Sequence, residues 1–254
     1  MMALLRAVVT AFSCFSAIPM PSLPWDERNM RHMLAAFPLV GAVIGAADLL
    51  WWQVAQHLGL GPVLTAAGLT LLPLLVSGGI HMDGLADVID ARSSHAEPER
   101  KREILKDPHS GAFAAMGVSG YLVAYLALAT ELDARGVALL ACTPIVSRCL
   151  SGLATICLRP ASPKGMLAAE RSTADARTVR IALVLLLTAS SALLLALSLP
   201  VGALALCAAA LSLAWVRRIA YREFGGMGGD LAGFCLEVAE LAMLAAVVLA
   251  ERLV

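Results

Sequence analysis

Long apolar stretches, separated by short polar connections, run along most of this chain. Seven of these stretches can cross the roughly 30 Å hydrocarbon core of a bilayer as helices, the sixth being the shortest. They cover residues 34–57, 62–80, 112–131, 136–158, 179–199, 201–216 and 232–251. Proline and glycine mark several of the joins, as at Gly61-Pro62 and Pro200-Val201-Gly202. The pattern predicts an all-α, polytopic membrane helix bundle of about seven spans, with residues 1–254 forming a single integral-membrane domain.

The N-terminal stretch MMALLRAVVTAFSCFSAIPMP has the outline of a signal peptide, because Arg6 precedes a short apolar run. It contains no clear A-x-A cleavage site, and the residues that follow it, WDERNMRHM, are charged. We therefore expect a retained interfacial helix that is ended by Pro19 and Pro21.

The overall composition agrees with a membrane protein. Hydrophobic residues make up 59% of the chain and charged residues only 15%, whereas a soluble domain usually carries about 25% charged residues. The 19 basic and 19 acidic residues balance, so no global charge points to a nucleic-acid partner. The six cysteines lie in apolar surroundings without a CxxC pair, so we expect neither a zinc site nor a disulfide framework.

Lysine and arginine are distributed unevenly between the connections. Apart from Arg6 in the N-terminal stretch, fifteen lie before the first span or after the second, fourth and sixth: Arg28, Arg31, Arg92, Arg100, Lys101, Arg102, Lys106, Arg159, Lys164, Arg171, Arg177, Arg180, Arg217, Arg218 and Arg222. Only Arg135 and Arg252 lie at the opposite ends of the spans. Because loops rich in lysine and arginine stay on the cytoplasmic side, we expect the long connections, and any site for a water-soluble substrate, to face the cytoplasm.

The segment GGIHMDGLADVID, residues 78–90, concentrates acid directly after an apolar span. Asp83, Asp87 and Asp90 are spaced i, i+4 and i+7, which places them on one helical face. Like charges there repel, and a hard divalent cation with oxygen ligands would remove the repulsion. The alternative is a solvated helix start whose acids favour the N-terminal dipole. Gly84 would let a ligand or a second segment approach the backbone closely.

Two further segments carry candidate chemistry. In REILKDPHSG, residues 102–111, Lys106 could meet phosphate oxygens and Asp107 could supply another carboxylate, although the basic residues there also serve the charge asymmetry. In YREFGGMGGDLAGFCLEVAEL, residues 221–241, two glycine pairs lead into Asp230, so backbone amides could cradle a phosphate. Three acids lie on one face of the last span: Asp230, Glu237 and Glu240. Acids within a bilayer usually face a polar interior.

Arg148 is a basic residue well inside the fourth span. It could form a structural salt bridge to Glu237 or Glu240, or it could grip an anionic substrate, and both interpretations stay open. Asp48 in the first span could simply face a polar crevice.

The acidic segment resembles the G-G-x-H-x-D-G-L-A-D-x-x-D signature of the cobalamin synthase family, the adenosylcobinamide-GDP ribazoletransferases. Other stretches are similar to the family's remaining motifs, in the family's order: FSAIPMP, FPLVGAVIG, LKDPHSGAFAAMGV, VSR and FGGMGGDLAGFCLEVAEL. The chain departs from the family pattern at Ala91, at Pro108 and at Gly228, where the family has glycine, serine and threonine. These departures bear on rate or substrate preference, since the motif carboxylates are all present.

The resemblance implies a Mg²⁺-dependent transfer at a bacterial cytoplasmic (inner) membrane, with the active site facing the cytoplasm. The 5′-hydroxyl of α-ribazole, or of its 5′-phosphate, attacks the cobinamide-side phosphate of adenosylcobinamide-GDP. GMP leaves, and adenosylcobalamin or its phosphate forms. The resemblance leaves homo-oligomers and association with other corrinoid-assembly enzymes open.

Residue by residue, the resemblance implies three sets of functional side chains. The catalytic set is Asp83, Asp87 and Asp90, one of which acts as the base. The metal ligands are Asp83, Asp87, Asp90, Asp107 and Asp230. The substrate-binding set is His81, Lys106, Arg148, Arg222, Glu237 and Glu240.

Other classes of protein also use buried acids at a membrane. A CDP-alcohol phosphotransferase or an aspartate-rich prenyltransferase would normally show a second aspartate repeat, and here only the acids of the last span are available for one. A secondary transporter would use Arg148, Asp48 and those acids as a path, and such proteins often contain internal repeats. The sequence shows no such repeat, and its acids cluster near the cytoplasmic edge.

Overall fold

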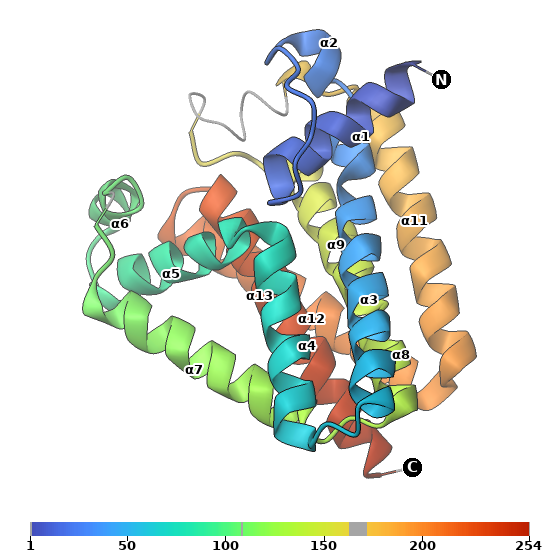
Figure 1. The fold of residues 1–254 in the computed structure, drawn as a ribbon. Helices are drawn as coiled ribbons and strands as arrows, with labels where there is room; N and C mark the ends of the chain where they lie inside the picture. Colours follow the sequence, from blue (N-terminus) through green and yellow to red (C-terminus); the bar gives the residue numbers. More distant parts are fainter. Residues whose placement is uncertain (1, 108, 163–171, 254) are drawn as a thin grey trace.

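The chain forms a helical bundle in the computed structural model, which describes residues 2–107, 109–162 and 172–253 (Figure 1). Its helices are α1 (Met2–Phe15), α2 (Glu27–Met30), α3 (Met33–His57), α4 (Pro62–Ser77), α5 (Ile80–Ser93), α6 (Pro98–Ile104), α7 (Ala112–Ala129), α8 (Ala134–Leu140), α9 (Thr143–Cys157), α11 (Ala176–Leu197), α12 (Leu199–Glu223) and α13 (Gly229–Glu251). Among these residues, extended pairing is limited to one isolated bridge between Pro160 and Met227.

The helices confirm the predicted membrane bundle. Within the described residues, six segments are long and apolar enough to cross a membrane: α3, α7, the α8–α9 pair, α11, α12 and α13. The pair α4 and α5 would make a seventh, but it is bent by 95°. The chain is therefore an integral membrane protein, with six or seven candidate spans in its described part.

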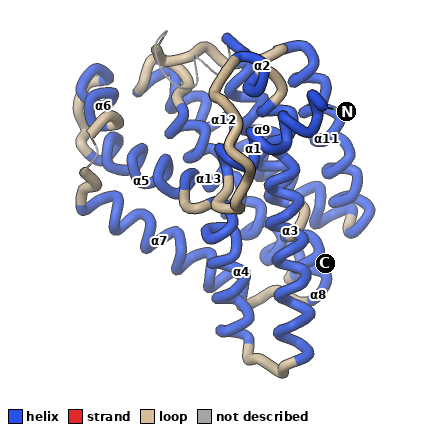
Figure 2. Tube along the Cα trace, turned by 45° about the horizontal axis from the view of Figure 1, so that its top comes forward, coloured by secondary structure: helices blue, strands red, loops and turns tan. Residues whose placement is uncertain are grey.

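The bend between α4 and α5 is built from two glycines. Gly78 and Gly79 have φ angles of +66° and +78°, a left-handed conformation that side chains with a Cβ rarely adopt. The chain that joins α1 to α2 crosses this end of the bundle (Figure 2), and it is fastened to the bend because Ala17 N–H donates to the Val76 carbonyl at 2.8 Å. The second predicted span thus ends at Ser77, and α5 runs sideways from it (Figure 1).

Two other predicted spans differ in detail. The fourth is interrupted between α8 and α9, where Pro144 near the start of α9 cannot donate a helical hydrogen bond. The sixth predicted span continues as α12 well past its apolar part, because the helix can extend beyond the bilayer and carry the exposed Arg217 and Arg218 there.

The N-terminal stretch is a helix, α1, as predicted, and it ends at Phe15. Lys164 and Arg171, which contributed to the charge asymmetry, lie outside the described residues.

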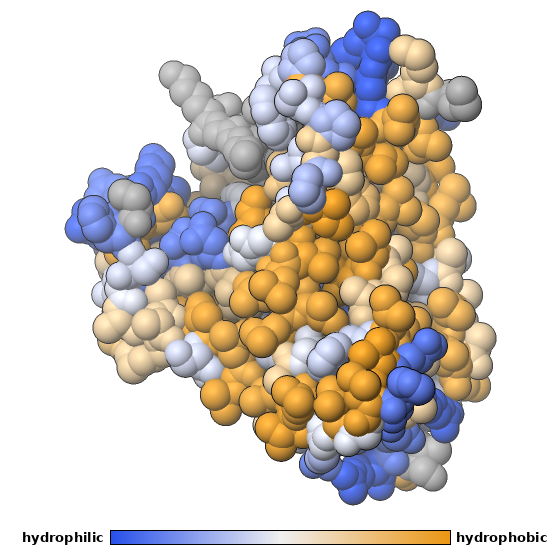
Figure 3. All heavy atoms as spheres, in the orientation of Figure 1, coloured by the Kyte–Doolittle hydropathy of each residue, from blue (hydrophilic) through white to orange (hydrophobic). Residues whose placement is uncertain are grey.

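The core lies around α13, which packs against α5, α9 and α12. Met243, Leu244 and Val247 of α13 are fully buried there. Large apolar side chains such as Leu75, Val123 and Leu211 instead remain exposed on the outer faces of the bundle. Figure 3 shows a broad apolar zone between hydrophilic ends, as expected for a surface in contact with lipid.

Candidate active site

The acidic face of α5 meets the first turn of α13 at a very close helix crossing. A Cβ on Gly84 would lie 2.7 Å from the Asp230 carbonyl oxygen, and a Cβ on Gly233 would lie 3.1 Å from the His81 carbonyl oxygen. Only glycine at these two positions lets the backbones come so close. The second segment expected at Gly84 is therefore α13, and the crossing brings Asp230 to the acids of α5.

Four carboxylates interact through this crossing. The charges of Asp83, Asp230 and Asp90 each act on the half-buried Asp87, and the charge of Asp83 acts on Asp230. In the described part of the chain, no ion pair joins any of them to a lysine or arginine. The fold thus assembles an uncompensated patch of negative charge, which the local sequence had indicated for α5 alone.

Asp90 also has a structural role. Its carboxylate accepts hydrogen bonds from the backbone N–H of Gly111 and, at 2.8 Å, of Ala114. It therefore caps the N-terminus of α7, whose own N-cap residue is a glycine without a side chain. Sequence reasoning missed this role because the capped residues, Gly111 and Ala114, lie more than twenty positions after Asp90 in the chain.

The carboxylates suit a magnesium ion that is shared with a substrate. Among the described residues, no three His, Cys, Asp or Glu side chains are placed to hold a metal ion by themselves. Mg²⁺ at phosphate-handling sites typically takes one or two carboxylates and completes its octahedron with water and substrate phosphate oxygens. Asp83, Asp87 and Asp230 offer hard oxygen ligands without a competing cation, so the donor set fits this mode of binding.

A cavity of about 260 Å³ opens beside the carboxylates, between α1, α3, α5, α9 and α13. It is lined by Phe15, Leu34, Phe37, Ile80, His81, Asp83, Ser151, Thr155, Gly229, Asp230, Ala232 and Gly233. Acids, hydroxyls and aromatic rings therefore line the same cavity. Two predicted metal ligands, Asp83 and Asp230, and the predicted substrate-binding residue His81 all reach it.

The predicted residues within the bundle form a buried group that meets the cavity wall, where the Arg148 guanidinium lies 5.7 Å from the centroid of the Phe37 ring. Arg148 Nη1 lies 2.8 Å from Glu240 Oε1 in an almost fully buried ion pair, and the Ser147 hydroxyl donates to the same oxygen at 2.6 Å. Glu237 is also buried and interacts with Tyr121. Asp48 is fully buried, and neither of its oxygens has a partner within the described residues. The structure thus contains the salt bridge that was one alternative for Arg148, with Glu240 as the partner; substrate binding by these residues stays a prediction.

In the described part of the chain, no hydrogen bond or ion pair joins Lys106 or Asp107 of the α6–α7 connection to α5 or α13. Asp107 accepts hydrogen bonds from Nδ1 of His109 at 2.8 Å and from its backbone N–H at 3.0 Å. These hydrogen bonds lower the pKa of the exposed Asp107 carboxyl. The structure therefore engages Asp107 with His109, and it leaves Lys106 exposed. Pro108 lies outside the described residues.

Arg222 is exposed at the end of α12, next to an acid that organises the neighbouring basic residues. Glu223 accepts from Lys101 at 2.7 Å and from Arg92 at 3.3 Å. These pairs fasten α5 and α6 to α12 and account for two basic residues without any ligand.

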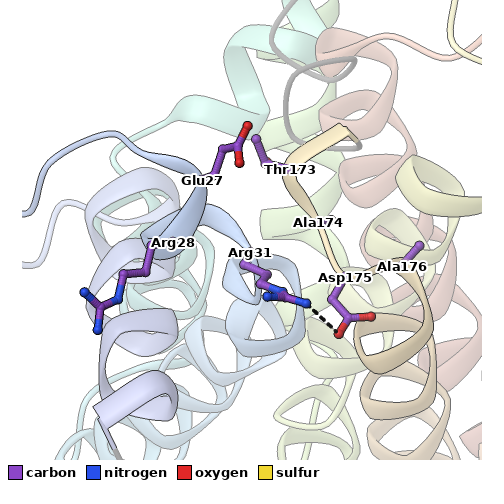
Figure 4. Close-up of a pocket in the computed structure, with 7 residues that line it drawn as sticks. All are labelled: Glu27, Arg28, Arg31, Thr173, Ala174, Asp175 and Ala176. Carbon is purple, nitrogen blue, oxygen red and sulfur yellow. Dashed lines mark ion pairs between the residues drawn. The ribbon is translucent and has the colours of Figure 1, made fainter.

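A larger cavity, of about 620 Å³, lies between α2 and the segment that leads into α11. Figure 4 shows Arg31 directed at Asp175, 3.8 Å away, and Arg28 directed away from both. Arg31 is exposed and Asp175 only half-buried, and the cavity lacks a convergent set of catalytic groups. The smaller cavity at the carboxylates is therefore the candidate active site.

Comparison with known proteins gives a consistent result along the whole chain. The family model described as cobalamin-5-phosphate synthase matches residues 7–248. An adenosylcobinamide-GDP ribazoletransferase of Lachnoclostridium phytofermentans is 40% identical over 98% of this chain and 96% of its own length. A protein of the same name from Stutzerimonas stutzeri is 34% identical over 89% of this chain and 90% of its own length. Another from Clostridium botulinum is 28% identical over 94% of this chain and 95% of its own length. No solved structure matches.

Proposed function

Because the chain belongs to the cobalamin-5-phosphate synthase family, it is a membrane transferase of cobalamin biosynthesis, and we propose that its α5–α13 crossing is where the transfer occurs. The substrates are adenosylcobinamide-GDP and α-ribazole or its 5′-phosphate. The observation that carries the proposal is the meeting of Asp83 and Asp87 with Asp230 beside a cavity.

The reaction exchanges a phosphoanhydride link for a phosphate ester link. The 5′-oxygen of ribazole attacks the phosphorus that bears cobinamide, and the bond from that phosphorus to the bridging oxygen breaks. GMP leaves with the bridging oxygen, and the hydroxyl proton passes to a carboxylate. Asp83 and Asp230, which line the cavity, are placed to receive this proton.

One or two of Asp83, Asp87 and Asp230 would also hold magnesium, with the pyrophosphate oxygens among its remaining ligands. The ion would supply positive charge that offsets the charge of the phosphoryl group during transfer. Asp90 keeps α7 seated on α5 through its two backbone hydrogen bonds and so holds the acidic face in position. The crossing glycines, Gly84 and Gly233, keep the acids of both helices at one site.

The exposed Lys106 and Arg222 would meet the guanine nucleotide, whose phosphates favour cationic partners. Both belong to the arginine- and lysine-rich connections, and this charge distribution supports a cytoplasmic location for this end of the bundle, at a bacterial inner membrane. A nucleotide-activated, water-soluble substrate is available on that side.

The test uses purified protein in nanodiscs with adenosylcobinamide-GDP, α-ribazole and Mg²⁺, and follows GMP and the corrinoid product by chromatography. We expect both products to appear in equal amounts and to stop on chelation of magnesium. Folded protein that yields neither product, with ribazole or with ribazole phosphate, would refute the proposed function. Omission of each substrate in turn provides the control for spontaneous hydrolysis.

A further inference from the structure

The cavity beside the carboxylates has an aromatic wall that the phosphate chemistry does not require. Phe15 of α1 and Phe37 of α3 lie with their ring centroids 4.3 Å apart. The His81 ring lies 5.5 Å from Phe37 and 6.2 Å from Phe15. Helices from distant parts of the sequence thus bring three flat rings to one side of the cavity.

His81 carries an unused hydrogen-bonding atom in this wall. The side chain is buried, with 6% of its surface exposed, and its Nε2 atom has no partner among the described residues. Buried polar atoms are almost always paired, and an exception calls for an explanation. His81 lines the cavity and Nε2 is shielded from solvent, so a ligand that packs on the ring becomes its partner once the ring turns toward it.

The hydroxyl groups of the cavity are already committed. Ser151 donates to the Ala232 carbonyl and Thr155 donates to the Ser151 carbonyl, both at 3.0 Å. They can still accept hydrogen bonds but offer no free proton. Within the described lining, Nε2 of His81 is therefore the available side-chain donor for a ligand that presents an acceptor.

The size of the cavity selects among the substrates. At about 260 Å³ it lies just below the range of roughly 300–1,000 Å³ typical for drug-sized ligands. A corrin macrocycle or a guanosine diphosphate group exceeds this space, whereas a single bicyclic aromatic base fits it. The acids that line it, Asp83 and Asp230, also disfavour a bare phosphate inside.

We propose that this cavity binds the benzimidazole base of the ribazole substrate. Phe15 and Phe37 contact the base, since flat aromatic groups pack favourably on such rings, and His81 Nε2 donates to the ring nitrogen that is not bonded to ribose. The ribose then lies toward Asp83 and Asp230, which receive its 5′-hydroxyl. The inference rests on the proposed function and adds to it which substrate occupies which part of the site.

The test separates the two substrates kinetically. His81→Leu and Phe37→Leu in nanodiscs should each raise KM for α-ribazole about tenfold, the ratio expected for one lost contact of ordinary strength, with little change in KM for adenosylcobinamide-GDP. His81→Gln, which retains an N–H donor, should recover part of the loss. Phe113→Leu, at an exposed position of α7, is the matched control and should resemble wild type.

Direct binding gives a second readout that does not depend on turnover. Calorimetry of wild-type nanodiscs with α-ribazole alone should show one binding site. The Phe37→Leu variant should bind α-ribazole more weakly, and this measurement still tests the inference if His81→Leu does not fold. If the His81 and Phe37 variants raised KM for adenosylcobinamide-GDP and left KM for α-ribazole unchanged, the inference would be overturned, but the proposed transferase function would still hold. Absence of any product with the wild-type protein would instead refute the proposed function.

Discussion

The close crossing of α5 and α13 can be tested with one added methyl group. In Gly84→Ala the new Cβ would stand 2.7 Å from the Asp230 carbonyl oxygen and 3.1 Å from its Cα. Both neighbours are backbone atoms, so no side chain can rotate away. Reaching an ordinary contact of 3.4 Å requires the helices to separate by about 0.7 Å, which would move Asp230 away from Asp83 and Asp87.

The expected effect on stability is small and the effect on rate is large. Overpacking typically costs about 1–3 kcal/mol, while replacing glycine by alanine within a helix recovers about 1 kcal/mol. A displacement of about 1 Å in a catalytic array can cost roughly a hundredfold in rate. We therefore expect Gly84→Ala to insert and fold but to lose about 10- to 100-fold in kcat.

The assay is GMP release at saturating substrates, with two glycine variants for comparison. Gly233→Ala meets its neighbours at 3.1 Å and should show a milder loss. Gly120→Ala in α7, where a Cβ meets nothing within 4 Å, should match wild type. A kcat for Gly84→Ala within twofold of Gly120→Ala would refute the reasoning that the crossing aligns the carboxylates.

Three further predictions follow from other contacts. Glu240→Leu leaves Arg148 buried without its carboxylate partner and should lower the free energy of unfolding by about 3–5 kcal/mol. Its Tm should therefore lie below that of Glu131→Leu, a control whose ion pair is exposed. Equal Tm values for the two variants would contradict this prediction. Asp90→Ala removes the cap of α7 and should cost about 0.5–2 kcal/mol, with faster hydrogen exchange at Gly111 and Ala114; unchanged exchange would rule out the cap. Gly78→Ala, at φ +66°, should lower the free energy of unfolding by about 1–2 kcal/mol, measured by thermal unfolding. Gly61→Ala, where a Cβ meets nothing within 4 Å, is the control and should not show this loss.

The membrane spans could be predicted from the sequence because burial in lipid imposes a long apolar run on each helix. The same signal could not reveal where a run changes direction. Hydropathy continues unbroken through Pro144, where α8 gives way to α9, and the bend at Gly78 and Gly79 depends on backbone angles that composition does not report. The exposed arginines of α12 ended the predicted span although the helix continued.

The candidate site was predictable only in its local part. The spacing of Asp83 and Asp87 on one helical face is a property of a single segment. Their meeting with Asp230 depends on two glycines in different helices, and the choice of Glu240 as the partner of Arg148 depends on how α9 and α13 pack. The aromatic wall at Phe15 and Phe37 joins two helices with no shared sequence signal, so it required the fold.

The most direct test of the central claim measures single-turnover GMP release from Asp83→Asn, Asp87→Asn and Asp230→Asn in nanodiscs, across a magnesium titration. Glu103→Gln, at an exposed acid of α6, is the control for charge removal. If the carboxylates of α5 and α13 form one site, all three variants should lose nearly all activity while inserting and folding normally, and Glu103→Gln should match wild type. Near-normal release from Asp230→Asn, with the α5 variants inactive, would show that α13 does not share the site and would contradict the account.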